Sequence, residues 1–288
     1  MAMLDYKIVP AYIKLVANGS IFNVMHRLLP DYVNEPLNIP VIDGYEFIGW
    51  FDKPEGGNQI DFSKRIDAGE YSESNPVMIY GQYKKRATEV ENLKDFMAAL
   101  ALGGEIKLTA NIDVTEQLFL TKDVVLDMNG KTLSNSVDLW DQTTGSFAII
   151  NTRYTDLTVK GNGKIIAKAD DCFCINAIDG SVVTIEDGTF IGNISSAYVQ
   201  QGIIKVLGGS FDIQQKDPRK GYEFELNCLD QFYRDGTAKI EVSGGRFVGF
   251  NPAANAAEST EKTTNFVIEG YKSVEVSEGV FDVVKDEA

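Results

Sequence analysis

A ten-residue phrase that recurs four times is the feature that most constrains how this chain can fold. The copies read VTIEDGTFIG, IKVLGGSFDI, IEVSGGRFVG and VEVSEGVFDV, and they span Val183–Gly192, Ile204–Ile213, Ile240–Gly249 and Val274–Val283. Each has the order apolar-x-apolar-x-x-Gly-x-Phe. The alternating apolar residues indicate a short strand, and a glycine allows a sharp corner because it has no side chain to clash. Each copy therefore predicts a strand, a corner and a second strand.

The spacing of the four glycines predicts how the copies stack. Gly209 follows Gly188 by 21 residues, Gly245 follows after 36 more and Gly279 after another 34. A basic unit of about twenty residues with variable insertions is typical of a solenoid built from stacked β coils. We expect each phenylalanine to point inward and stack on the one in the next coil. The repeat is then scaffold, and any recognition lies in the insertions between its copies.

The charge and composition exclude some classes of function. The 288-residue chain is 44% hydrophobic and has a net charge of −15, of which −13 falls after residue 86. Nucleic-acid phosphates would be repelled by this charge, and no apolar run is long enough for a membrane helix. Solubility explains the acidity better than cation binding does. The opening MAMLDYKIVPAYIKLV has no basic region followed by an apolar stretch, so no secretory signal is expected unless one was removed.

The three cysteines, Cys172, Cys174 and Cys228, are too few and too irregular for a disulfide framework. One pair remains open as an alternative. We favour free, buried thiols that act as small hydrophobic groups.

One amphipathic helix is predicted where the composition changes, after Lys84-Lys85-Arg86. In TEVENLKDFMAALALGG, Thr88 and Glu91 fit a capping box, and Gly103-Gly104 ends the helix. Its apolar face contains Val90, Leu93, Met97 and Leu100. The predicted domains are therefore residues 1–86, a capping helix over 87–104 that covers the end of the β structure, and a β domain over 105–288.

The β domain resembles a known family. Residues 88–288 contain a series of short predicted strands whose pattern begins with DMNGKTL. This pattern resembles the right-handed parallel β-helices of the pectin-lyase-like superfamily. The resemblance implies a mostly β chain with about six coils. It does not imply one function, because this fold is found in lyases, hydrolases, adhesins and phage fibres.

The first 86 residues resemble one Listeria–Bacteroides repeat, the small β-grasp-like module of internalin-type surface proteins. The matching residues are Asn18-Gly19, Pro36, Gly44-Tyr45, Phe47, Gly49-Trp50, Gly56-Gly57, Asp61-Phe62 and Tyr80-Gly81-Gln82-Tyr83. We expect Tyr45, Phe47 and Trp50 to alternate along a strand and to supply most of a small core.

This first domain departs from the family pattern at residues 21–33, which read IFNVMHRLLPDYV and are unusually apolar. The excess predicts either a docking surface that contains Phe22, Met25, Leu28 and Leu29 or simply a larger local core. The larger core is favoured.

The strongest catalytic candidate is ADDCFCIN, Ala169–Asn176. It resembles the Asp-Asp-Cys strand of polygalacturonases, which implies that Asp170 and Asp171 could be paired acids for glycoside hydrolysis. The chain's single histidine, His26, lies in the first domain, so it cannot serve as a base beside them. We therefore favour a turn at Asp170-Asp171 before a strand with Cys172 and Cys174 on one face.

The remaining acids and arginines suggest no catalytic or metal site. Calcium-binding candidates by residue type are Asp127, Asp156, Asp179, Glu186 and Asp187, with Arg153, Arg219, Arg234 and Arg246 as candidate cations. The sequence pairs none of these arginines with those acids, and solvated turn residues are the favoured interpretation. We expect no catalytic residue, cofactor or metal ligand.

The insertions contain the candidate binding residues. Trp140, Tyr222, Phe232 and Tyr233 lie beside polar residues in DLWDQTTG, QQKDPRKGYEF and DQFYRDG. Aromatic and polar loops on a rigid β scaffold can bind sugars or protein surfaces. The alternative, weighted equally, is that these rings fold back and fill their own loops.

Three functions fit these patterns. The favoured one is a non-enzymatic bacteriophage virion protein, a head or tail fibre or decoration protein that binds other virion proteins through residues 1–86, trimerises as β-helical fibres do, and attaches to a host-surface glycan. The first alternative is a bacterial cell-surface adhesin. The second is a polysaccharide lyase or hydrolase, for which the sequence supplies no base.

Overall fold

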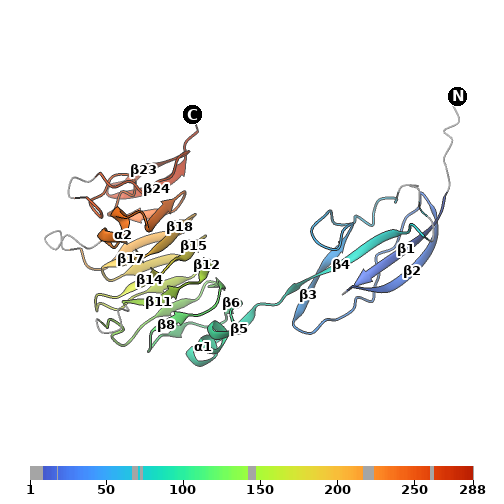
Figure 1. Ribbon diagram of the computed structural model, residues 1–288, viewed down its shortest axis with the longest axis horizontal. Helices are drawn as coiled ribbons and strands as arrows, with labels where there is room; N and C mark the ends of the chain where they lie inside the picture. Colours follow the sequence, from blue (N-terminus) through green and yellow to red (C-terminus); the bar gives the residue numbers. More distant parts are fainter. Residues whose placement is uncertain are drawn as a thin grey trace. The chain divides into compact units, whose positions relative to one another are not determined.

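The computed structural model describes residues 9–17, 19–66, 71, 74–141, 147–216, 224–259 and 263–287, without the side chains of residues 9–12, 22 and 27. The chain divides into two compact units, Met1–Arg86 and Ala87–Ala288. Both units consist mainly of β-strands (Figure 1).

The first unit contains a four-stranded sheet in the order β2-β1-β4-β3. Its strands are β1 (Val9–Ala17), β2 (Ser20–Leu29), β3 (Tyr45–Phe51) and β4 (Val77–Lys85). The central pair, β1 and β4, is parallel, whereas β1–β2 and β3–β4 are antiparallel. The fully buried side chains Ile13, Leu15, Leu29, Ile79 and Trp50 form most of its core.

The prediction of an alternating aromatic core in β3 is wrong in part. Trp50 is buried and Phe47 packs against the core, but Tyr45 is exposed. A β-bulge between Phe47 and Gly49 breaks the alternation, so that Phe47 and Trp50, three residues apart, lie on the same side with their rings 5.3 Å apart. Aliphatic residues of β1 and β4 supply the rest of the core.

The structure separates the four residues proposed as a docking surface. Leu29 is fully buried, which corrects its placement on a surface, and Met25 packs partly against the same core. Leu28 points away from the core and is 60% exposed. The side chain of Phe22 lies outside the described residues. The apolar segment therefore enlarges the core with one face of β2 and exposes Leu28 on the other.

The second unit is a stack of parallel strands with a β-helix-like fold (Figure 1). The seven-stranded sheet contains β5 (Thr88–Val90), β6 (Gly104–Leu108), β9 (Val124–Asp127), β12 (Asp156–Lys160), β15 (Ser181–Ile185), β18 (Gly202–Val206) and β21 (Ala238–Val242). The eight-stranded sheet contains β7 (Ile112–Asp113), β10 (Thr132–Ser134), β13 (Lys164–Ile166), β16 (Thr189–Gly192), β19 (Ser210–Ile213), β22 (Arg246–Val248), β23 (Tyr271–Ser277) and β24 (Val280–Lys285). The five-stranded sheet contains β8 (Leu118–Leu120), β11 (Ala148–Arg153), β14 (Phe173–Ile178), β17 (Ser195–Val199) and β20 (Leu226–Cys228). The chain passes through the three sheets in this order, as in β12, β13 and β14.

The predicted phenylalanine ladder is confirmed for three of the four copies. Phe190, Phe211 and Phe247 are at most 1% exposed and occupy the same register on β16, β19 and β22. Their ring centroids lie 5.2 and 5.0 Å apart, and both interplanar angles are 11°. The corner needs glycine at Gly209, where φ is +94° and an added Cβ would lie 2.9 Å from the carbonyl oxygen of Gly188.

The fourth copy of the phrase is not another coil, which corrects the prediction of four equivalent units. Residues 274–283 form an antiparallel hairpin of β23 and β24, and β24 pairs antiparallel with β22. Phe281 lies opposite Phe247 in this register but is only partly buried. The same sequence pattern therefore ends the stack by reversing the chain direction.

The predicted capping helix exists, but its start was placed too early. Helix α1 spans Leu93–Leu102, and Thr88 lies in strand β5, so the proposed capping box is wrong. Asn92 caps the helix instead, because its side chain accepts a hydrogen bond from the Asp95 N–H at 3.0 Å. Phe96, Ala99 and Leu100 are buried in the core of the second unit, and α1 lies at the β5 end of the stack (Figure 1).

Two further features of the second unit are a short helix and three cysteines. A second helix, α2 (Asp230–Arg234), forms in a loop where none was predicted. All three cysteines are buried free thiols, and burial raises the pKa of each thiol above its ordinary range. The Cys174 thiol donates to the carbonyl oxygen of Ile165 at 3.3 Å.

Candidate ligand-binding face

The outer face of the five-stranded sheet contains a row of side chains at one register. Phe119, Asn151, Asn176, Tyr198 and Asn227 follow one another on β8, β11, β14, β17 and β20. Their apolar sequence neighbours on these strands belong to the core, so β-strand alternation directs the row outward. We call Asn151, Asn176 and Asn227 the amide row.

A second set of rings runs beside the amide row, and we call it the aromatic row. Trp140 lies 5.4 Å from Phe147, Phe147 lies 6.1 Å from Phe173, and Phe173 lies 4.8 Å from Tyr198, measured between ring centroids. Trp140 is 40% exposed at one end of the row. This face therefore exposes the rings of Trp140 and Phe119, whereas Asn151 and Asn176 are buried in it.

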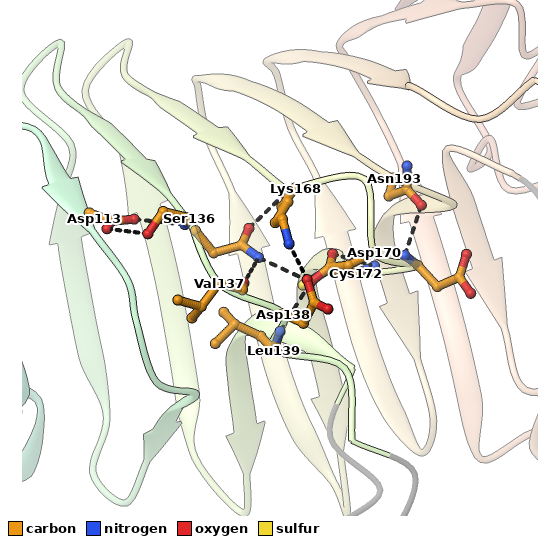
Figure 2. A network of polar contacts seen from close by, with 11 residues as sticks. Asp113, Ser136, Val137, Asp138, Leu139, Lys168, Asp170, Cys172 and Asn193 are labelled. Atoms are coloured by element: carbon orange, nitrogen blue, oxygen red, sulfur yellow. Dashed lines mark hydrogen bonds and ion pairs between the residues drawn. The ribbon is translucent and has the colours of Figure 1, made fainter.

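The loop that contains Trp140 is fixed at the preceding residue. The Leu139 N–H donates to Asp170 Oδ2 at 3.0 Å, and the Leu139 carbonyl oxygen accepts a hydrogen bond from Gln117 Nε2. Asn135 Nδ2 also donates to Asp170 Oδ2, at 3.3 Å, and to the Val137 carbonyl oxygen at 2.8 Å (Figure 2). Both backbone polar groups of Leu139 are thus occupied by side chains of neighbouring coils, which orients the ring of the next residue.

Asp170 acts in this network as a structural acceptor. Its Oδ1 also accepts from the Cys172 N–H at 3.3 Å. Burial raises the pKa of the Asp170 carboxyl, opposed by the hydrogen bonds from Leu139 and Cys172. Asp171 has a φ of +64°, and its N–H donates to Asn193 Oδ1 at 2.8 Å (Figure 2). The two aspartates form the turn before β14, as the sequence favoured.

The rest of the network in Figure 2 ties three coils together. Lys168 forms an ion pair with Asp138, and its N–H donates to Asn135 Oδ1 at 2.7 Å. One coil earlier, Asp113 accepts both the N–H and the hydroxyl of Ser136, at 2.8 and 2.6 Å. These bonds fix the segment that leads to Trp140.

Of the acids considered for calcium binding, Asp127 and Asp156 are terminal residues of strands β9 and β12, and the others directly follow β14 or β15. Asp127 accepts from the Asn129 N–H at 2.9 Å, and Asp187 accepts from the Gly188 N–H at 2.7 Å. The N–H of Asp156 donates to Asp123 Oδ1 at 2.9 Å. Within the described part of the chain, no three His, Cys, Asp or Glu side chains cluster to hold a metal ion.

The arginines are partly paired, which the sequence did not reveal. Arg153 Nε lies 3.0 Å from Asp179 Oδ2, which corrects the expectation that these arginines and acids do not pair. Arg246 binds Asp282 through two bonds of 2.7 and 2.8 Å, and Arg234 lies 3.6 Å from Asp230. Glu186 lies near the ion pair of Lys160 and Glu105. Arg219 lies outside the described residues.

Of the three described aromatic residues that were predicted to bind a ligand, Trp140 alone lies in the aromatic row. Phe232 and Tyr233, on α2, are half-buried against the core, and Tyr233 contacts Phe266 edge-on at 6.3 Å. Tyr222 lies outside the described residues. Phe119 was not among the predicted binding residues, although its position between Leu118 and Leu120 in the sequence indicates that it faces outward.

Two carboxyl groups flank β20 at the end of this face, the half-buried Glu258 and the buried Glu225. The Cys228 N–H donates to Glu258 Oε1 at 2.7 Å, and burial raises the pKa of Glu258 to about 7. Glu225, 3% exposed and directly before β20, has its pKa raised by burial to about 8. Burial, and secondarily the charge of Glu258, raises the pKa of Tyr198 above its ordinary range.

Comparisons with known proteins give no relative for this chain: no protein-family model, curated protein or solved structure matches it. In the described residues, neither helix has the length and apolar character needed to cross a membrane.

Proposed function

We propose that this protein is a non-enzymatic structural protein of a bacteriophage virion that attaches to a glycan on the host surface. The observation that carries the proposal is the clamped loop at Leu139, which holds the exposed Trp140 ring on a rigid sheet. Binding sites are often formed by loops that a rigid scaffold positions. In this proposal the second unit is a right-handed parallel β-helix of about six coils that projects the binding face.

The roles of the acidic residues support binding over catalysis. Asp170 is the centre of the best catalytic motif in the sequence, yet its carboxylate accepts three hydrogen bonds that hold the protein's own backbone and Asn135. A general acid or base must reach the substrate. Asp170 is instead a positioning residue for the loop that bears Trp140.

Residues 1–86 are, in this proposal, a β-grasp-like module of the Listeria–Bacteroides type that binds other virion proteins. The sheet order β2-β1-β4-β3 with a parallel central pair supports this assignment. Strand β2 lies at one edge of the sheet and exposes Ile21, Val24 and Leu28. An edge strand with exposed apolar residues is suited to pairing with another chain. Trimerisation is proposed by analogy with β-helical fibres.

The test is electron microscopy of the purified chain mixed with phage particles and bacterial cells of its source, together with light scattering to determine the oligomeric state. The proposal predicts ordered copies on the particle, with residues 1–86 toward it, and loss of cell attachment in Trp140→Ala. A protein that ignores particles but binds cells contradicts the virion assignment and favours the adhesin. Release of oligosaccharides from a host glycan would contradict the non-enzymatic assignment and favour the lyase or hydrolase.

A further inference from the structure

We infer that the outer face of the five-stranded sheet binds an uncharged glycan rather than an acidic one. The inference rests on the proposed function, because it names the ligand class for the face that the proposal uses. Three observations carry it: the exposed rings beside β11, the buried and uncharged amide row that crosses β11 at Asn151, and the pairing of nearby cations with acids.

The exposed rings follow the direction of strand β11. Trp140 contacts Phe147, the residue directly before β11, and Phe119 lies beside Asn151 in the middle of the strand. Tyr154, directly after β11, is 78% exposed. At about 3.3 Å per residue, the backbone positions Phe147, Asn151 and Tyr154, beside which these rings lie, are separated by roughly 13 Å and 10 Å. Flat rings at such intervals match an extended oligosaccharide, since the C–H faces of sugar rings pack against aromatic rings.

The polar groups that cross β11 at the register of Asn151 are amides. Asn176 is completely buried, and neither its Oδ1 nor its Nδ2 forms a hydrogen bond with the residues that the structure describes. The same holds for Oδ1 of Asn151 and of Asn227. A buried polar atom without a partner is unfavourable, and such atoms are rare in folded proteins. Hydroxyl and acetamido groups of a neutral sugar can both donate to and accept from a side-chain amide. Because Asn151 and Asn176 are completely buried, they bond a sugar only after the groups that cover them move.

The charges near the face disfavour an anion. Two cations close to its edges are already paired, Lys168 with Asp138 and Arg153 with Asp179 at 3.0 Å. Residues 87–288 contain 18 basic and 31 acidic residues, a net charge of −13. An acidic polysaccharide would be repelled by this net charge, whereas a neutral one would not.

The experiment is isothermal titration calorimetry of the full chain with two oligosaccharides of equal length, neutral chitotetraose and anionic tetragalacturonate. We expect chitotetraose to bind with little dependence on salt and tetragalacturonate not to bind. Trp140→Ala and Phe119→Ala should each weaken chitotetraose binding by about tenfold or more, the effect of losing a binding hot spot. Leu207→Ala is the matched control, because Leu207 is 49% exposed but lies outside this sheet; it should bind as the unmodified chain does.

Cell attachment by the same variants separates failure of this inference from failure of the proposed function. Tighter binding of tetragalacturonate, or chitotetraose binding that Trp140→Ala and Phe119→Ala leave unchanged, overturns the inference. If neither oligosaccharide binds while Trp140→Ala still abolishes cell attachment, the inference is overturned and the proposed function stands. If Trp140→Ala attaches to cells as well as the unmodified chain does, the proposed function fails as well.

Discussion

The second unit has aromatic residues in two places, inside the stack and on its outer face, and the two sets differ in ring geometry and in their relation to the sequence repeat. Phe190, Phe211 and Phe247 form a buried ladder with nearly parallel rings 5.0–5.2 Å apart. The outer row from Trp140 to Tyr198 has centroid distances of 4.8–6.1 Å and interplanar angles of 31° to 54°. The inner set follows the sequence repeat, whereas the outer set combines strand and loop residues with amides.

The two sets differ in the property that they affect: the inner ladder stabilises the fold, and we propose that the outer row contributes to ligand binding. The inner ladder gains free energy by burial of apolar surface and by close packing, which favour identical residues in identical places. The outer row has different neighbours on each coil, so its residues need not be alike. Substitutions inside should therefore change stability, and substitutions outside should change binding.

The largest effect is expected inside. Phe211→Ala should lower the unfolding free energy of the second unit by about 3–5 kcal/mol, because it opens a cavity between two packed rings. Guanidinium unfolding followed by circular dichroism measures this change. Phe281→Ala is the matched control, since Phe281 occupies the same place in the repeat but is only half-buried, and it should cost about 1 kcal/mol. Equal losses for the two variants would contradict the distinction between the ladder and the hairpin.

The second-largest effect is expected at Asp170, which holds the loop that contains Trp140. Asp170→Ala removes the acceptor of the Leu139 and Cys172 N–H groups, and it should lower the unfolding free energy by about 1–3 kcal/mol. It should also weaken chitotetraose binding, because the Trp140 loop loses one of its two clamps. Asp170→Asn, which keeps one acceptor oxygen, should restore most of both properties. Unchanged affinity in Asp170→Ala would refute the positioning role.

A pH effect is expected at the β20 end of the face. The pKa of Glu225 is about 8 in the folded protein and should be near its ordinary 4.5 in the unfolded chain. Between these pH values the folded state holds a proton that the unfolded state has lost, so the unfolding free energy falls as pH rises. Glu225→Gln should remove this part of the fall, and its advantage over the unmodified chain should grow from pH 5 to pH 8. Melting temperatures across this range measure it, and parallel profiles would contradict the prediction.

The smallest effect on stability is expected at Trp140. Its ring is 40% exposed and contacts one ring, so Trp140→Ala should change the unfolding free energy by no more than about 1 kcal/mol. The same variant should lose most of its glycan affinity. A large loss of stability would place Trp140 in the scaffold and would remove the contrast between the two sets.

The sequence revealed the inner set better than the outer one for a physical reason. The Gly-x-Phe phrase encodes local geometry, so Phe190, Phe211 and Phe247 could be placed inside from the pattern alone. The phrase could not show that the fourth copy forms a hairpin, because strand direction depends on how the chain turns at Gly279. The amide row depends on which residues of five separate strands share a register, and the variable insertions between strands hide that register in the sequence. Trp140 was found by residue type alone, without its clamp.

The most direct test of the separation between scaffold and recognition uses the intrinsic fluorescence of the two tryptophans. Trp50 is 1% exposed and Trp140 is 40% exposed, so iodide should quench Trp140 selectively. Quenching is measured with and without saturating chitotetraose, and Leu207→Ala serves as the control. If recognition lies on the outer face, the oligosaccharide should protect Trp140 from iodide. Quenching that stays the same while calorimetry shows the ligand bound would place recognition elsewhere and contradict this account.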